Sequence, residues 1–273
     1  MTKDSTLPWT LDDIHYDQIN LKLIEQDETL MFLLAASSFV ESGSDLYTSN
    51  LSEHYKAHPE ICNWLNAHWE EEELQHGKAL AKYVTSVWPD FDWPKAFEHF
   101  MAEYGPTCAI EALETDRGLE MVARCVVETG TSSLYRAIAS YTKEPVLIEL
   151  ANHIRIDEVR HYKYFLQYFR EYNIKQPIGR YKTTKAIYKR LKEIRDEDST
   201  TALKHVFLMR YPDESLESEH FKRICTLSTK IVQQHLPIDT AVRMLLTPLA
   251  LPKRLQRWIE MPVANLVKKA LLN

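Results

Sequence analysis

Features that mark several other protein classes are scarce in this chain of 273 residues. It has only six glycines, and most of its twelve prolines fall between runs with apolar periodicity. β-Branched residues that alternate with polar ones and are bounded by tight Asn-Gly turns, the pattern of β-hairpins, are missing. Long helices exclude glycine and use proline at their starts, so the composition predicts an all-α protein.

Cysteine pairs, long apolar runs and a basic surplus are missing as well. The four cysteines, Cys62, Cys108, Cys125 and Cys225, lie far apart without a Cys-x-x-Cys pair, which argues against a zinc knuckle or a disulfide framework. No run of 18 apolar residues and no basic-then-apolar leader occurs, so we expect a cytoplasmic protein without a membrane span. The net charge of −6 argues against a general nucleic-acid binder.

Apolar periodicity and proline positions predict the helices. The expected helices in the first part of the chain cover residues 11–26, 27–50, 59–88, 95–104, 106–141 and 145–172. Proline opens three of them, in the first turn, where a helix tolerates it. We expect residues 1–172 to form a bundle with an N-terminal helix, and residues 173–273 to form an accessory helical region packed on it, within the same domain.

Two Glu-x-x-His pairs lie on the predicted helices. In WEEEELQHGKALAKYV, Glu73 and His76 stand three residues apart, so on a helix they share one face and could bind one metal ion. Glu158 and His161 repeat the pair in DEVRHYKYF. Residues 217–220 hold a third pair, but in the wholly polar DESLESEHFKR, which is typical of a solvated face. A pair alone is therefore weak evidence for a metal site.

The first two pairs share a repeated spacing that the third lacks. Glu41 lies 32 residues before the first pair and Glu128 lies 30 before the second. Pro59 divides the first interval into 18 and 14 residues, and Pro145 divides the second into 17 and 13. The chain thus contains the same helical hairpin twice. Residues 70–72 are expected on the surface, because only the last of the four consecutive glutamates keeps phase with the histidine.

These spacings predict four acids and two histidines that converge inside a four-helix bundle. One Glu from each of two helices and a Glu-x-x-His pair from each of the other two is the ligand set of di-iron and di-manganese carboxylate proteins. Two divalent cations offset most of the charge of four buried carboxylates, and carboxylate with imidazole suits iron or manganese. The predicted metal ligands are Glu41, Glu73, His76, Glu128, Glu158 and His161.

The motifs around both pairs resemble a known family. The pattern W-x-x-E-E-x-x-H-G followed by L-x-K-Y is matched by Trp69, Glu72, Glu73, His76, Gly77, Leu80, Lys82 and Tyr83. The pattern D-E-x-R-H is matched by Asp157, Glu158, Arg160 and His161. Over roughly residues 28–172 the chain resembles the ferritin-like di-iron carboxylate superfamily, and within it the soluble acyl-acyl-carrier-protein desaturases. The resemblance implies a ferritin-like bundle with a dinuclear metal site in its core, accessory C-terminal helices and a homodimer.

The resemblance also implies roles for two residues beside the ligands. In the family, the aspartate before the second glutamate hydrogen-bonds a ligating histidine, a role that Asp157 would take with His76 as its partner. Thr131 stands three residues after Glu128, where the family has a threonine implicated in handling dioxygen and protons, and Ser132 is a nearby substitute. The alternative for Thr131 is an ordinary helix hydroxyl that bonds back to the preceding turn.

The implied activity is that of an oxygen-dependent non-haem di-iron oxidase. It would use dioxygen and two iron ions, cycling between Fe2+ and Fe3+, with manganese as an alternative metal. The reaction would attack an unactivated C–H bond of a fatty-acyl chain, bound to a carrier protein or as a thioester, and end in desaturation or hydroxylation. A ferredoxin-type donor would supply electrons. The basic run from Lys175 to Arg195 would dock an acidic carrier protein, or is simply the solvated face of a helix.

Other functions remain open at this stage. One is a ferritin-like iron-binding or ferroxidase protein without an organic substrate. Another is a di-iron hydroxylase or N-oxygenase of a different substrate, such as modified tRNA, and a third is a structural bundle without metal. The radical subunit of ribonucleotide reductase shares both pairs, but it carries its radical tyrosine four residues after the first histidine. Here that position is Leu80, with Tyr83 three residues further on, so we expect no stable tyrosyl radical.

Overall fold

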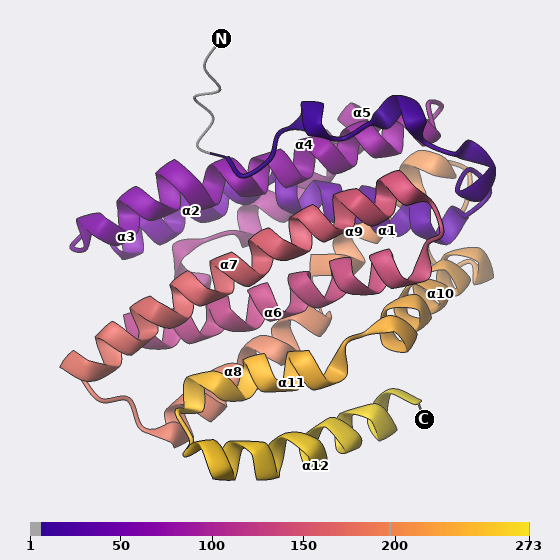
Figure 1. The fold of residues 1–273 in the computed structure, drawn as a ribbon. Coiled ribbons are helices and arrows are strands. Elements are labelled where there is room, and N and C mark those ends of the chain that lie inside the picture. Colours follow the sequence, from indigo (N-terminus) through magenta and orange to yellow (C-terminus); the bar gives the residue numbers. More distant parts are fainter. Residues whose placement is uncertain (1–6, 197, 273) are drawn as a thin grey trace.

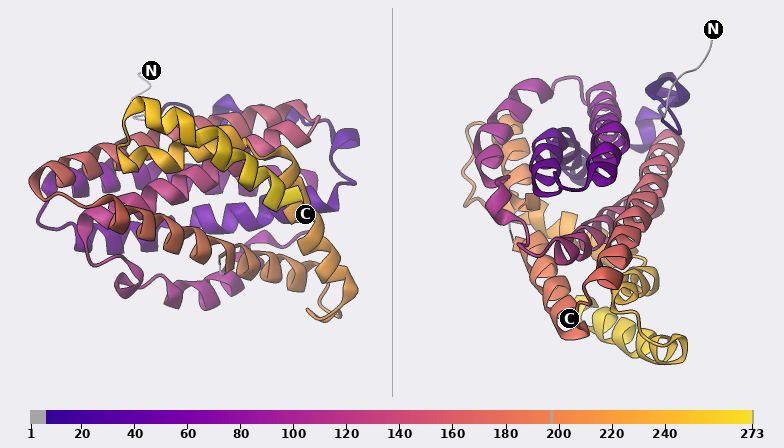
Figure 2. Two further views of the ribbon diagram at one scale, coloured as in Figure 1. Left: turned by 90° about the horizontal axis from the view of Figure 1, so that it is seen from below. Right: turned by 90° about the vertical axis from the view of Figure 1, so that its left-hand side faces the viewer.

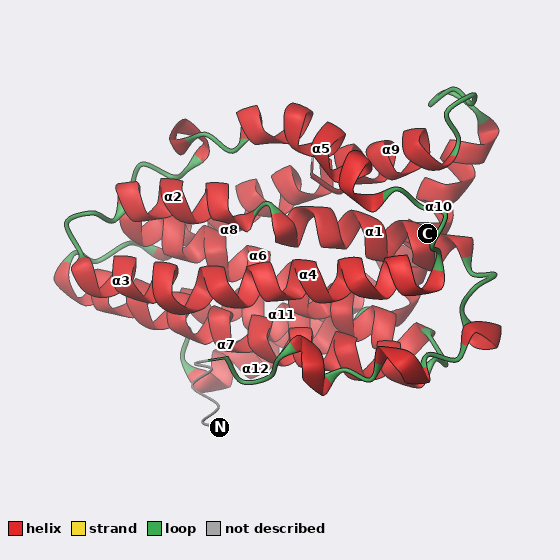
Figure 3. Cartoon of the chain, turned by 90° about the horizontal axis from the view of Figure 1, so that it is seen from above, coloured by secondary structure: helices red, strands yellow, loops and turns green. Residues whose placement is uncertain are grey.

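The computed structural model describes residues 7–196 and 198–272, and every regular element in these ranges is a helix (Figures 1 and 3). This confirms the predicted all-α class. The four cysteines, all in the described part of the chain, form no disulfide. No helix in the described part of the chain combines the length and the apolar content needed to cross a membrane.

The first helical hairpin is formed by residues 28–87. Its outgoing arm is α1 (Glu28–Ser42), continued after Gly43 by α2 (Ser44–His54). Its returning arm consists of α3 (Pro59–Trp64), a π-helical segment (Leu65–Trp69) and α4 (Glu70–Val87). Pro59 opens the returning arm in the first helical turn, as predicted.

The second hairpin is formed by α6 (Arg117–Tyr141) and α7 (Pro145–Lys175), whose starts are both capped by acids. The Asp116 side chain accepts hydrogen bonds from the first backbone N–H groups of α6, and Glu144 does the same for α7. A long connection through α5 (Trp93–Tyr104) joins the two hairpins, which gives the chain a ferritin-like four-helix bundle. The fold prediction is therefore confirmed.

One predicted helix is wrong, and another begins later than predicted. Residues 11–26 form no α-helix but three 3-10 turns, Leu11–Asp13, Tyr16–Gln18 and Leu21–Leu23. Polar groups bond the backbone here in place of helical partners: the Asp13 carboxylate accepts from the backbone N–H of Thr10 and Glu144 from that of Asn20. The helix predicted from Pro106 starts only at Arg117, because 3-10 turns occupy Gly105–Thr107 and Ile110–Ala112.

The C-terminal helices pack mainly against α6 of the second hairpin and α1 of the first. They are α8 (Arg180–Asp196), α9 (Asp198–Arg210), α10 (Glu219–His235), α11 (Ile238–Leu246) and α12 (Lys253–Leu272). α8, α10 and α11 pack against α6, and α9 packs against α1 and α5. α12 packs against α11 and lies along the outer edge of the molecule, as Figure 1 and the right-hand view of Figure 2 show.

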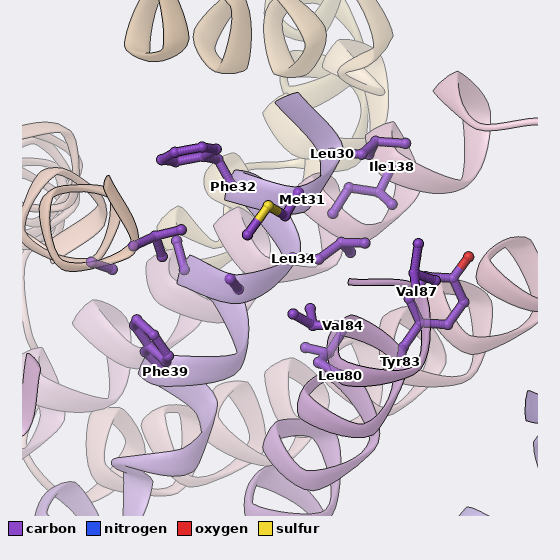
Figure 4. Packing of buried hydrophobic residues seen from close by; sticks show 14 of the residues in the cluster. Leu30, Met31, Phe32, Leu34, Phe39, Leu80, Tyr83, Val84, Val87 and Ile138 are labelled. Atoms are coloured by element: carbon purple, nitrogen blue, oxygen red, sulfur yellow. The ribbon is translucent and has the colours of Figure 1, made fainter. Parts of the chain in front are cut away.

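Two apolar clusters fill the bundle, one toward each end. In the first, residues of α1 such as Leu34 face Leu80 and Val84 of α4 (Figure 4). The second cluster includes Leu65 and Phe165. On α4, α6 and α7 the predicted metal ligands lie between residues of the first cluster and residues of the second. The core therefore contains a polar layer between two apolar ones.

Candidate metal centre

The structure brings all six predicted ligands together in this polar layer. Glu41 comes from α1, the first Glu-x-x-His pair from α4, Glu128 from α6 and the second pair from α7. Each of the six has 6% or less of its surface exposed. α1 and α4 approach each other closely at Gly77. A Cβ atom at this position would lie 2.7 Å from the backbone nitrogen of Ser42. Only glycine permits this distance between the two ligand-bearing helices.

Two overlapping groups of possible ligands result. One contains Glu41, Glu73, His76 and Glu158, and the other contains Glu73, Glu128, Glu158 and His161. Within each group the possible ligand atoms lie within 4.8 Å of one another. Glu73 and Glu158 belong to both groups, and each group has one histidine and one further glutamate of its own, so the six residues together would hold two cations.

The Nδ1 atoms of both histidines lie next to the central carboxylates, where atoms that bind a metal ion would lie. His76 Nδ1 lies 3.2 Å from Glu158 Oε1 and 3.9 Å from Glu41 Oε2, and His161 Nδ1 lies 2.9 Å from Glu73 Oε1. These Nδ1 atoms, and the same oxygens of Glu73 and Glu158, are buried without a hydrogen-bond partner of good geometry among the described residues. Such orphaned donors and acceptors are costly, and a cation between them would satisfy them together.

The outward nitrogens of both histidines are hydrogen-bonded to acids of the opposite helix. His76 Nε2 lies 3.0 Å from Asp157 Oδ2, which confirms the contact expected from the sequence. His161 Nε2 lies 2.6 Å from Glu72 Oε2. In each case the acid directly precedes the glutamate of the other pair. An acceptor at Nε2 keeps the proton there and leaves the Nδ1 lone pair directed inward, as a metal ligand requires.

The expectation that Glu72 lies on the surface is therefore wrong, because it is buried between α4 and α7. Arg160 joins it to its counterpart, since its Nη2 lies 2.6 Å from Glu72 Oε2 and 2.8 Å from Asp157 Oδ1. Asp157 also accepts a 2.7 Å hydrogen bond from the indole N–H of Trp9. One signal could have identified Glu72: both pairs have the form acid-Glu-x-x-His, so the role expected of Asp157 had an equivalent at Glu72.

Thr131 makes both of the contacts considered for it. Its hydroxyl lies 2.5 Å from Glu158 Oε2 and 3.3 Å from the backbone oxygens of Val127 and Glu128. It can therefore donate a hydrogen bond to a central carboxylate. Ser132 instead donates to the carbonyl of Thr129 in its own helix. The structure thus places Thr131, and not its neighbour, at the centre.

Tyr135 of α6 also belongs to the centre, although it was not predicted from the sequence. It is buried, and its hydroxyl donates a hydrogen bond to Glu41 Oε1. It follows Glu128 by seven residues, two helical turns on the same face, which is a signal that the sequence contained. Tyr83 points elsewhere, as expected, because its hydroxyl donates to Glu144 at 2.8 Å.

Burial and mutual charge make the centre hold protons when no cation is present. Burial, followed by the charges of Glu158 and Glu41, raises the pKa of Glu73 well above its ordinary value. Burial and the charge of Glu158 raise the pKa of Glu128 to about 8. Burial opposes a charge on His76, but the nearby carboxylates of Asp157, Glu158 and Glu41 outweigh it and raise the pKa of His76 well above its ordinary value. A bound cation would displace these protons.

The remaining sequence features lie outside the centre. In the third pair, Glu217 is exposed and precedes α10, while His220 contacts Glu214. Three cations of the basic run contact other segments of the same chain. The Arg180 side chain donates to the carbonyls of Leu249 and Ala250, Lys189 pairs with Glu114, and Arg190 is buried 3.7 Å from Glu120. Lys182, Lys185 and Lys192 remain exposed.

Comparison with known proteins yields structural neighbours only. No family model and no curated protein sequence matches the chain. Among solved structures, a variant of an R2-like ligand-binding oxidase with an aerobically reconstituted Mn/Fe cofactor is 16% identical, with a TM-score of 0.46 over 96% of this chain and 88% of that one. Another variant, with an Fe/Fe cofactor, is 15% identical with a TM-score of 0.44 over the same shares. At these values the assignment of the centre depends on its own geometry.

Proposed function

We propose that this protein is an oxygen-dependent oxidase with a non-haem dinuclear metal centre, held by Glu41, Glu73, His76, Glu128, Glu158 and His161. The observation that carries the proposal is the match between the two ligand groups, which we call half-sites. The first half-site is the group with His76, and the second is the group with His161. Each half-site has a histidine whose inner nitrogen lacks a partner and whose outer nitrogen is bonded to an acid. A purely structural bundle would gain nothing from six buried polar ligands arranged in this way.

The donor set supports iron, with manganese as the alternative. Each ion would have one imidazole nitrogen and carboxylate oxygens only, a combination that suits iron and manganese and contains no soft thiolate. Cys125, three residues before Glu128, bonds toward the carbonyl of Tyr162 and is not among the ligand groups. When bound, two such ions supply the redox chemistry that activates dioxygen.

The protein's own groups would hold and orient this centre. Asp157 and Glu72 fix the two imidazoles, and Arg160 holds both acids against each other. The Thr131 hydroxyl, at Glu158 Oε2, is placed to donate or return a proton at that carboxylate. The Tyr135 hydroxyl plays the corresponding part at Glu41. We therefore assign Thr131 and Asp157 supporting roles in the reaction, Thr131 with protons and Asp157 with the position of His76.

The proposed substrate is a fatty-acyl chain presented as a thioester or on a carrier protein, and the proposed reaction is desaturation or hydroxylation at an unactivated C–H bond. The motif resemblance to acyl-carrier-protein desaturases supports it. The exposed lysines of α8, Lys182, Lys185 and Lys192, are the proposed contact for an acidic carrier. A ferredoxin-type protein is the proposed electron donor.

The first experiment is metal analysis after iron-replete expression, followed by stopped-flow absorbance when the anaerobically reduced protein meets dioxygen. We expect about two irons per chain and a transient absorbance whose lifetime changes when acyl thioesters are added. Two irons that oxidise without any response to acyl thioesters would instead identify a ferroxidase. Less than one metal per chain, together with no reaction with dioxygen, would refute the dinuclear centre.

The same measurements on Glu128→Gln and Glu217→Gln provide a matched pair. Both replace a glutamate by its isosteric amide, but Glu128 is buried in the centre and Glu217 is exposed outside it. The first variant should lose metal and the second should retain two irons. Equal metal content in both variants would contradict the assignment of the ligands.

A further inference from the structure

The outward face of α12 combines exposed apolar side chains with cations. Leu255, Trp258, Met261 and Leu266 have 43%, 81%, 71% and 68% of their surface exposed. At 100° per residue they fall within one arc of about 140°, on the side of the helix away from the less exposed Gln256, Glu260 and Val263. Large apolar side chains gathered on one exposed face mark an interaction surface more often than scattered single ones do.

The charges on α12 have one sign where the helix is exposed. Lys253, Arg254, Arg257 and Lys269 are exposed. Glu260, the one acid in residues 253–269, is turned inward, where it accepts from Gln256 and faces Arg243 of α11 at 3.6 Å. Exposed cations therefore lie at both ends of the apolar face, and no acid in residues 253–269 is exposed beside them.

A second helix extends the same character. On α8, Tyr181 and Tyr188 are 82% and 70% exposed, and Lys182 and Lys185 are exposed beside them. The view from below in Figure 2 shows α8 and α12 on this side of the molecule, and the turn Thr247–Leu249 packs against α8 between them. Both helices thus expose aromatic and basic residues.

We propose that α12, assisted by α8, is a docking surface for an anionic phospholipid bilayer. The apolar side chains would enter the acyl boundary while lysine and arginine reach the phosphates, the pattern of an amphipathic helix that lies in the membrane interface. A second copy of the chain fits less well, because a two-fold contact between α12 helices would bring their cations together. This inference does not depend on the metal centre.

The test is co-sedimentation of the full chain with vesicles of phosphatidylcholine alone and of phosphatidylcholine with phosphatidylglycerol. We expect binding to the anionic vesicles only, weakened by added salt. Trp258→Glu with Met261→Glu should reduce the partition coefficient about tenfold or more, and Arg254→Glu with Arg257→Glu should abolish the preference for anionic lipid. Exposed controls elsewhere, Leu23→Glu and Lys143→Glu, should bind as the unchanged protein does.

Two outcomes would overturn the proposal. The unchanged protein could fail to bind anionic vesicles, or the α12 variants could bind as well as the controls do. If the first outcome comes with a change of oligomeric state in the α12 variants, measured by sedimentation velocity, α12 contacts another protein chain instead. Metal content, measured on every variant, should stay constant, which separates this result from any failure of the oxidase proposal.

Discussion

The hydrogen bond between Glu72 and His161 allows a direct test of how the second half-site is built. In Glu72→Gln the amide keeps the size of the side chain but loses its charge. It can turn its N–H toward His161 Nε2, which would favour the wrong tautomer, and it leaves Arg160 with Asp157 as its only charged partner in this cluster. We expect the ion held by His161 to bind more weakly than the ion held by His76.

The magnitude follows from the single contact that is removed. Loss of an outer partner of a metal-bound histidine typically reduces affinity about 10- to 100-fold, equal to about 1.4–2.7 kcal/mol. Glu72 lies 2.6 Å from His161 Nε2 and is buried, so a value in the upper half of this range is expected. The fold should be retained, because the four helices keep both apolar clusters.

A titration with Mn2+, with free ion counted by electron paramagnetic resonance, measures the two sites separately. Glu72→Gln should show one site close to the unchanged affinity and one weakened site. The exposed neighbour Glu71→Gln is the control and should titrate as the unchanged protein does. Two unchanged sites in Glu72→Gln, or equal weakening in both variants, would refute the argument that the outer acid positions His161.

Three further predictions test the centre and its helices. Glu128→Ala should lose at least one ion yet leave the thermal midpoint of the metal-free protein unchanged or higher, because a costly buried carboxyl is removed; a lower midpoint with full metal content would contradict this. Metal affinity should fall as the pH drops below about 8, because protons bound at groups such as Glu128, whose pKa is raised, compete with the metal. The fall should be about tenfold per pH unit for each proton displaced. Equal Mn2+ affinity at pH 6 and pH 8 would be inconsistent with this prediction. Gly77→Ala should lower the free energy of unfolding in urea by about 1–3 kcal/mol, since its Cβ would meet the Ser42 backbone, whereas Gly130→Ala, with open space around the Cβ, should raise it by about 0.5–1 kcal/mol; the reverse order would disprove the close helix contact.

The sequence by itself determined the helical class, the two hairpins and the six central residues. These features depend on local periodicity, because residues three apart on a helix share a face whatever surrounds it. The repeated intervals around Pro59 and Pro145 then related the two hairpins to each other. The hydrogen bond between Asp157 and His76 was predicted from the motif resemblance, and it is present in the structure.

The tertiary structure alone decided which polar groups meet across helices. Spacing alone could have placed Glu72 and Tyr135 on the faces of their helices that carry the ligands. That Glu72 meets His161 and Tyr135 meets Glu41 depends on the relative rotation and height of separate helices, which no spacing within one helix specifies. The 3-10 turns of residues 11–23 have the same origin. Their apolar residues resemble a helical pattern, but Trp9 and the backbone of Asn20 find partners on α7 and at its cap, and these long-range bonds outweigh local helix propensity.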